Sequence, residues 1–99
     1  MIRGTTPQHT FLFPFDPATC SEIIVTYQQK GIDVLEKTLP DMTIDSTANT
    51  ISYRLTQEET LGFDEGFVRL QVKAKVGNNV MASAIMNVPA TEILNEEVI

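Results

Sequence analysis

The side chains that could do chemistry are few and lie far apart along the chain. His9 is the only histidine and Cys20 the only cysteine, so no internal disulfide can form. A zinc site needs three or four ligands and would have to recruit carboxylates or a second chain. A general base needs partners that orient it, and the sequence indicates none for His9. We therefore expect His9 to be a half-exposed strand residue and Cys20 a half-buried structural one.

The acidic residues also lack the arrangement that catalysis or metal binding requires. Glu58 and Glu59 are adjacent, so their side chains splay apart, whereas catalytic carboxylates converge on one point. Asp41, Asp45 and the pair at 64–65 fall in turns, and no calcium-loop pattern surrounds them. Phosphate-binding loops and nucleophile motifs are absent as well. The sequence therefore predicts a protein that is not an enzyme and that has no cofactor and no metal.

Composition and charge narrow the class of protein further. The 99 residues are 42% apolar and 20% charged, which predicts one folded domain over residues 1–99. Seven basic residues oppose thirteen acidic ones, for a net charge of −6. No basic cluster is present, so we expect no nucleic-acid partner. No apolar run approaches the roughly 20 residues that span a bilayer, and no signal-peptide pattern is visible. We expect the chain not to associate with a membrane, and we expect it to fold in the cytoplasm.

Alternation of apolar and polar residues is the main structural signal. In FVRLQVKAKV, residues 67–76, every second side chain is apolar, as in a strand with one buried face. The turn residues GNN precede a second run, VMASAIMNV at 80–88, which predicts a hairpin over 67–88. Shorter strand patterns occupy 9–15, 22–29, 32–39, 42–44 and 50–55. About seven short strands at this spacing indicate an antiparallel sandwich or barrel.

The stretch LTQEETLGF, residues 55–63, alternates with neither neighbouring strand. Thr56 and Glu59 have the spacing of a capping box, so we expect a single helical turn near 57–61. A strand, a helical turn and a strand in the opposite sheet form a corner typical of immunoglobulin-like folds. The sequence therefore predicts an all-β fold, an antiparallel immunoglobulin-like β-sandwich of about seven strands.

Some apolar residues fall on strand faces that we expect to meet water. They are Leu12, Ile24, Phe67, Met81 and Ile85. Strand 80–88 is apolar on both faces in this reading, and a two-layer sandwich has no third layer to cover it. We infer that this face meets a partner subunit. A β-bulge inside the strand would exchange its two faces, and this alternative stays open.

Residues 90–99 form a possible docking tail. Ile93, Leu94, Val98 and Ile99 are apolar and stand among glutamates. Such a tail could dock on its own domain, dock on a neighbouring chain or stay frayed. Together with the five strand residues, these four make up the candidate protein interface.

Four stretches carry a resemblance to a known group of proteins. They are MIRGTTPQHTFLFPFD at 1–16, VTY at 25–27, ISYRLTQEETLGF at 51–63 and LNEEVI at 94–99. Together they resemble small proteins encoded among the virion structural genes of tailed phages and prophages of Gram-positive bacteria. Residues 3–7, 9–11 and 14–16 are the most specific part of this likeness, followed by LTQEET at 55–60.

The resemblance implies an immunoglobulin-like β-sandwich that serves as a minor structural or assembly component, associated with the tail or baseplate. It implies no catalytic residues. The expected partners are other virion proteins or copies of the chain itself, as a homo-oligomer. The expected location is the host cytoplasm during assembly and then the virion. The alternative is a soluble module that binds carbohydrate or a host-surface ligand, although the chain lacks Trp, and Tyr27 and Tyr53 fall on predicted core faces.

Overall fold

The computed structural model describes residues 1–99, and antiparallel strands dominate it. In chain order the strands are β1 (Gln8–Leu12), β2 (Glu22–Gln29), β3 (Ile32–Thr38), β4 (Thr43–Asp45), β5 (Thr50–Arg54), β6 (Gly66–Val76), β7 (Asn79–Ala82) and β8 (Met86–Ala90). The helical elements are the 3-10 turns η1 (Pro17–Thr19) and η2 (Leu39–Asp41) and the helix α1 (Gln57–Leu61). The molecule measures 44 × 28 × 18 Å.

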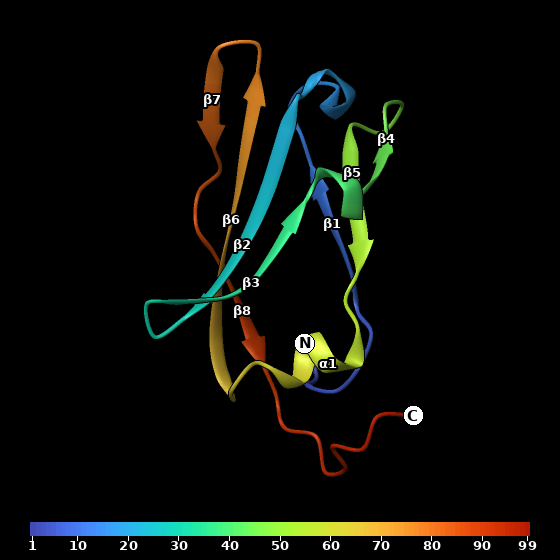
Figure 1. The fold of residues 1–99 in the computed structure, drawn as a ribbon, viewed down its shortest axis with the longest axis vertical. Coiled ribbons are helices and arrows are strands. Elements are labelled where there is room, and N and C mark those ends of the chain that lie inside the picture. Colours follow the sequence, from blue (N-terminus) through green and yellow to red (C-terminus); the bar gives the residue numbers. More distant parts are fainter.

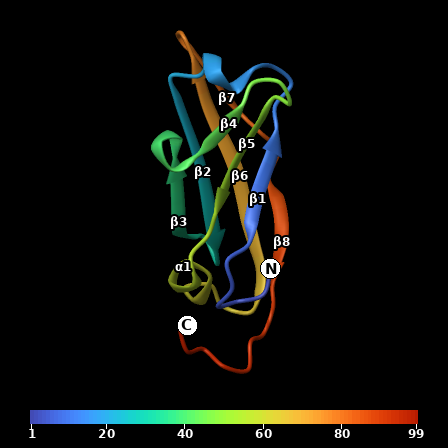
Figure 2. The ribbon, with the colours of Figure 1, turned by 90° about the vertical axis from the view of Figure 1, so that its right-hand side faces the viewer.

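The strands form two sheets that pack face to face (Figure 1). The first sheet has the order β1-β5-β4. The second has the order β3-β2-β6-β7, and β8 also pairs with β6, beyond β7 along the same edge. Figure 2 shows β1, β5 and β4 in front of β2 and β6. Every pairing between strands is antiparallel, which confirms the predicted all-β sandwich.

The order of the strands is that of the immunoglobulin fold without its first strand. That fold places strands A, B, E and D in one sheet and strands C, F and G in the other, with C′ beside C in the variable type. Here β1, β5 and β4 take the places of B, E and D, while β3, β2 and β6 take those of C′, C and F. β7 and β8 together take the place of G, and no strand lies in the place of A beside β1.

The core lies between the sheets and follows the predicted alternation. Val68, Leu70, Val72 and Ala74 of β6 are all buried, and the residues between them are exposed. The largest wholly buried side chains include Tyr27 of β2 and Phe63, which follows α1. Burial of this kind is worth roughly 25 cal/mol for each Å² of apolar surface removed from water, so these side chains dominate the stabilisation.

The predicted single strand over 80–88 is wrong, because a bulge divides it into β7 and β8. Lys73 of β6 pairs with Ala82, but Leu70 pairs with Met86, so residues 83–85 face only residues 71 and 72. The extra residue shifts the register by one and exchanges the two faces, as a β-bulge does. Met81 is therefore opposite the buried Ala74 and points to the core side, not to the face first assigned to it.

The helical turn and its capping box are confirmed. The Thr56 hydroxyl accepts a hydrogen bond from the Glu59 N–H at 3.1 Å, and the Glu59 carboxylate accepts one from the Thr56 N–H at 2.8 Å. α1 carries the chain from β5 in one sheet to β6 in the other. The Arg3 guanidinium reaches this corner from the N-terminal segment and donates to the carbonyls of Leu61 and Phe63.

The first and last segments of the chain meet beside β8. Ile2 forms a parallel bridge with Thr91, and the terminal ammonium of Met1 donates to the Pro89 carbonyl at 2.8 Å. The Arg3 N–H donates to the Thr91 carbonyl. The N-terminal residues therefore cover the outer edge of β8 but leave β7 uncovered.

Candidate functional site

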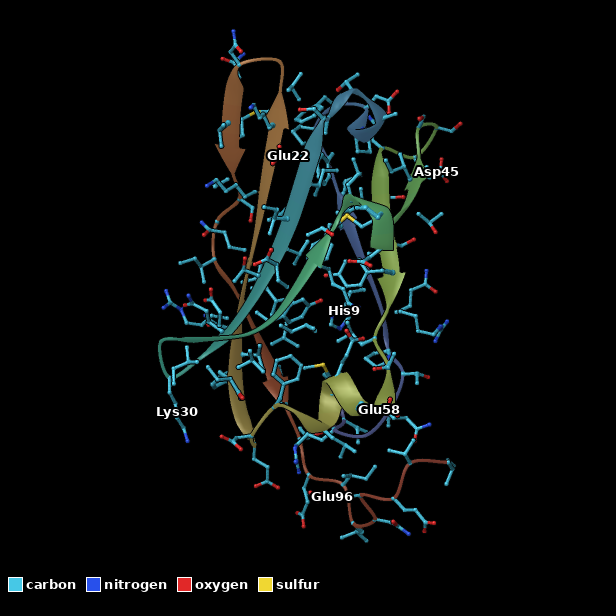
Figure 3. All side chains as sticks on the ribbon, viewed as in Figure 1. His9, Glu22, Lys30, Asp45, Glu58 and Glu96 are labelled. Carbon is cyan, nitrogen blue, oxygen red and sulfur yellow. The ribbon has the colours of Figure 1, made fainter.

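A short chain of polar side chains lies inside the sandwich. His9 of β1 projects between the sheets (Figure 3), and its Nδ1 lies 2.6 Å from the Tyr27 hydroxyl. That hydroxyl lies 2.5 Å from the Tyr53 hydroxyl of β5. All three side chains are satisfied if Tyr53 donates to Tyr27, Tyr27 donates to Nδ1 of His9, and His9 carries its proton on Nε2.

The surroundings of His9, Tyr27 and Tyr53 keep these three side chains neutral. Burial, helped by the positive N-terminus, lowers the pKa of His9. Burial also raises the pKa of both tyrosines well above the usual value of phenols. The Nδ1 lone pair of His9 is already engaged by the Tyr27 hydroxyl, and neither tyrosine ionises near neutral pH. The three residues tie β1, β2 and β5 together across the core, which is a structural role.

An apolar groove lies on the side of the molecule where strand A is missing. Its volume is about 340 Å³, and nine of its eleven lining residues are hydrophobic. One wall is the segment 11–15 at the end of β1, which includes three phenylalanines. The other wall comes from the second sheet: Val72, Ala74, Met81 and Met86. We call this groove and the strand edges of β1 and β7 beside it the open side.

The edge of β1 on the open side presents unpaired backbone groups. The Leu55 N–H donates to the Pro7 carbonyl, and the Phe13 N–H donates to the Asn49 carbonyl, so residues 7 and 13 point their backbone groups toward β5. Antiparallel pairing alternates between the two sides of a strand. Gln8, Thr10 and Leu12 therefore direct their N–H and C=O groups away from β5, and no other strand pairs with β1.

The two stretches that form the open side contain no charged residue, but the Arg54 guanidinium of β5 reaches one end of β1 and donates to the Thr6 carbonyl at 2.7 Å and to Gln8 Oε1 at 3.3 Å. The chain has twenty charged residues, yet none lies between Gly4 and Phe15 or between Val76 and Thr91. The fold brings these two stretches together, since β1 comes from the first and β7 and β8 from the second. An uncharged and apolar surface with a free strand edge is suited to contact with another protein.

The nine residues predicted as an interface do not form one patch. Only Leu12 and Met81 come together, because both line the groove. Ile24, Phe67 and Ile85 lie on the outer face of the second sheet, each partly or largely exposed. The prediction that Met81 and Ile85 share one solvent-exposed face is therefore wrong, because the bulge between them turns Met81 to the core side.

The four tail residues lie at the far end of the molecule, near α1. Leu94 and Ile99 are almost fully exposed, whereas Ile93 is half-buried and reaches the space beside Gly4. The tail is held to its own chain, since the Gln57 amide exchanges two hydrogen bonds with the backbone of Ile99. Glu96 adds an ion pair of 3.0 Å with Arg3.

Sequence reasoning missed the free edge of β1 and most of the groove. The signal that could have found them is the pair of uncharged stretches, 4–15 and 76–91. No group of three or more His, Cys, Asp or Glu side chains is close enough together to hold a metal ion. The only α-helix is one turn long, and no helix could cross a bilayer.

By its strand order this protein is an immunoglobulin-like β-sandwich, and it has no strand beside β1 on its open side. Comparisons with models of protein families, with curated proteins and with solved structures give no match.

Proposed function

We propose that this chain is a non-enzymatic structural domain that works by packing against other proteins. The observation that carries the proposal is the open side, where an apolar groove and an unpaired strand edge lie together and are both built from uncharged residues. Monomeric proteins usually protect a free strand edge with charges, proline or a covering segment. An unprotected edge beside an apolar groove is what an adding strand needs, because the backbone supplies hydrogen bonds and the groove accepts side chains.

The resemblance of the sequence to small phage proteins sets the proposed context. In this proposal the chain is a minor structural or assembly component of a virion, associated with the tail or the baseplate. It is made in the host cytoplasm and then enters the particle. Its partners are copies of itself or other virion proteins.

The chemistry of the groove favours a protein partner over a sugar. Sugar sites combine an exposed aromatic ring with polar groups that hydrogen-bond hydroxyls. The two tyrosines of this chain are buried in the core and bonded to each other. The rings at the groove are phenylalanines, which offer a sugar no hydrogen bond.

The test is the protein content of particles from a host that carries this gene. Mass spectrometry of purified virions and of assembly intermediates should find the chain in a fixed ratio to the other structural proteins. A variant with Leu12 changed to Asp should enter particles less well, because it places a charge beside the groove where Leu12 is 78% exposed. Absence of the chain from both particles and intermediates would refute the proposal.

A further inference from the structure

The four sheet edges of this molecule are not protected equally. The edge strand β3 carries Asp33, Glu36 and Lys37, and the β2–β3 ladder has an irregularity at Tyr27/Gln28. β4 has only three residues and ends in Asp45. Residues 1–3 cover β8. Charges, short length and covering segments are the usual means of keeping strand edges from pairing. β1 and β7, on the open side, contain no charged residue and no segment covers them, although β7 has only four residues.

We propose that the open side binds a second copy of this chain, by antiparallel pairing of β1 with β1 of the partner about a two-fold axis at Thr10. This inference rests on the proposed function and specifies its first partner. The two β1 strands would join the three-stranded sheets of the two copies into one continuous sheet. The same axis would turn the two apolar grooves toward each other.

The register follows from the backbone groups that β1 leaves free. Gln8, Thr10 and Leu12 point outward, so only these residues can form hydrogen-bonded pairs with the partner. When the pairing is centred on Thr10, each Gln8 lies opposite Leu12 of the partner subunit. All the outward N–H and C=O groups of Gln8, Thr10 and Leu12 then form hydrogen bonds. Pro14 is the next outward position and has no N–H, so the ladder ends there. The edge is thus complementary to itself.

The self-complementary edge of β1 points to a second copy as the occupant, and the distribution of charge points to this side as the place of contact. Two chains with a net charge of −6 repel each other in most orientations. The thirteen acidic residues all lie outside the two uncharged stretches that form the open side. Contact through β1 is therefore the approach that brings the fewest like charges together.

Size-exclusion chromatography with light scattering over a concentration series tests the pairing. The monomer has a mass of 11.0 kDa, and the unmodified chain should show a reversible dimer of twice that mass. Thr10→Lys places two ammonium groups directly opposite each other across the axis, and we expect it to raise the dissociation constant more than about tenfold. Thr10 is exposed and its N–H serves no bond within the fold, so the variant should fold normally.

Two further measurements make the test specific. Thr43→Lys is the matched control, because Thr43 is an exposed residue on β4, the other edge of the same sheet, and it should leave the dimer intact. Mixing Thr10→Lys with Thr10→Glu should restore association as a heterodimer, since opposite charges then face each other. Circular dichroism should show the same fold for all variants.

Each outcome decides the inference. A wild-type chain that stays monomeric at every concentration overturns it, and so does a Thr10→Lys variant that dimerises as well as Thr43→Lys. Failure of the two oppositely charged variants to associate with each other would exclude the register. If the chain is monomeric in solution but present in particles, the inference fails while the proposed function stands.

Discussion

Removal of the Tyr27 hydroxyl tests the polar chain in the core. This hydroxyl is the central member, with His9 Nδ1 at 2.6 Å on one side and the Tyr53 hydroxyl at 2.5 Å on the other. The Tyr27→Phe substitution keeps the ring, which is wholly buried, and leaves both neighbours without their partner. The Tyr53→Phe substitution removes only one bond and leaves Tyr27 free to donate to His9.

The two substitutions should lower the free energy of unfolding by different amounts, because only Tyr27 bonds to both other side chains. A hydrogen bond contributes about 1 kcal/mol net, whereas a buried group left unpaired costs about 1–3 kcal/mol. We therefore expect Tyr27→Phe to lower the free energy of unfolding by about 2–4 kcal/mol and Tyr53→Phe to lower it by about 1 kcal/mol. The double variant should lose less than the sum, because it no longer contains an unpaired Tyr53 hydroxyl. Against a total of about 5–15 kcal/mol for a domain, these differences are large enough to measure.

Urea unfolding followed by circular dichroism at pH 7.5 measures these free energies. At that pH His9 is neutral in both the folded and the unfolded chain, since its folded pKa is lowered below 6.5. A second series at falling pH tests the same environment. The unfolded histidine takes up a proton more readily than the folded one, so stability should be complete above about pH 6.5 and fall as the pH drops. Equal losses for Tyr27→Phe and Tyr53→Phe would refute the chain of donors described here.

Two other predictions concern the corner and the bulge. Glu59→Gln keeps the capping bond to the Thr56 N–H but loses the 2.6 Å ion pair with Lys37, so it should cost about 1 kcal/mol at neutral pH. Burial opposes ionisation of Glu59, but hydrogen bonds from Lys37 and Thr56 outweigh this effect and lower its pKa. The difference in unfolding free energy between variant and wild type should therefore shrink as the pH falls below about 4.5, which urea titrations would measure. Ser83→Ala removes the acceptor of the Val72 N–H at 3.0 Å and should cost about 1 kcal/mol. Faster hydrogen exchange confined to Val72 and its neighbours would verify this effect, and unchanged exchange there would contradict it.

Local patterns were sufficient to predict most of the fold. The strands β2 and β6 follow the alternation of their sequences almost to the residue, because each has one face on the core and one in water. The helical turn α1 was predicted by the spacing of Thr56 and Glu59, a signal that depends only on residues three apart. Because the chain passes from one sheet to the other at this turn, the turn also predicted an immunoglobulin-like sandwich.

The bulge and the open side could not be predicted in the same way. Both alternating sets of residues 80–88 contain large apolar side chains, so nothing local shows where the extra residue lies. The hydrogen bonds of Ser83 decide the place, and they depend on the backbone of Val72 in the neighbouring strand. The open side depends on a strand that is missing beside β1, and only the arrangement of both sheets reveals such an absence.

The bulge also determines the chemistry of the open side. Without the extra residue, Ala82 would lie opposite Ala74 and face the groove, while Met81 would lie on the outer face beside the lysines of β6. The shifted register instead turns Met81 toward the phenylalanines of the segment 11–15. Methionine has a flexible and polarizable side chain that adapts to different neighbours, which suits the contact proposed for this surface. A single inserted residue thus gives the groove a wall that can repack around a partner.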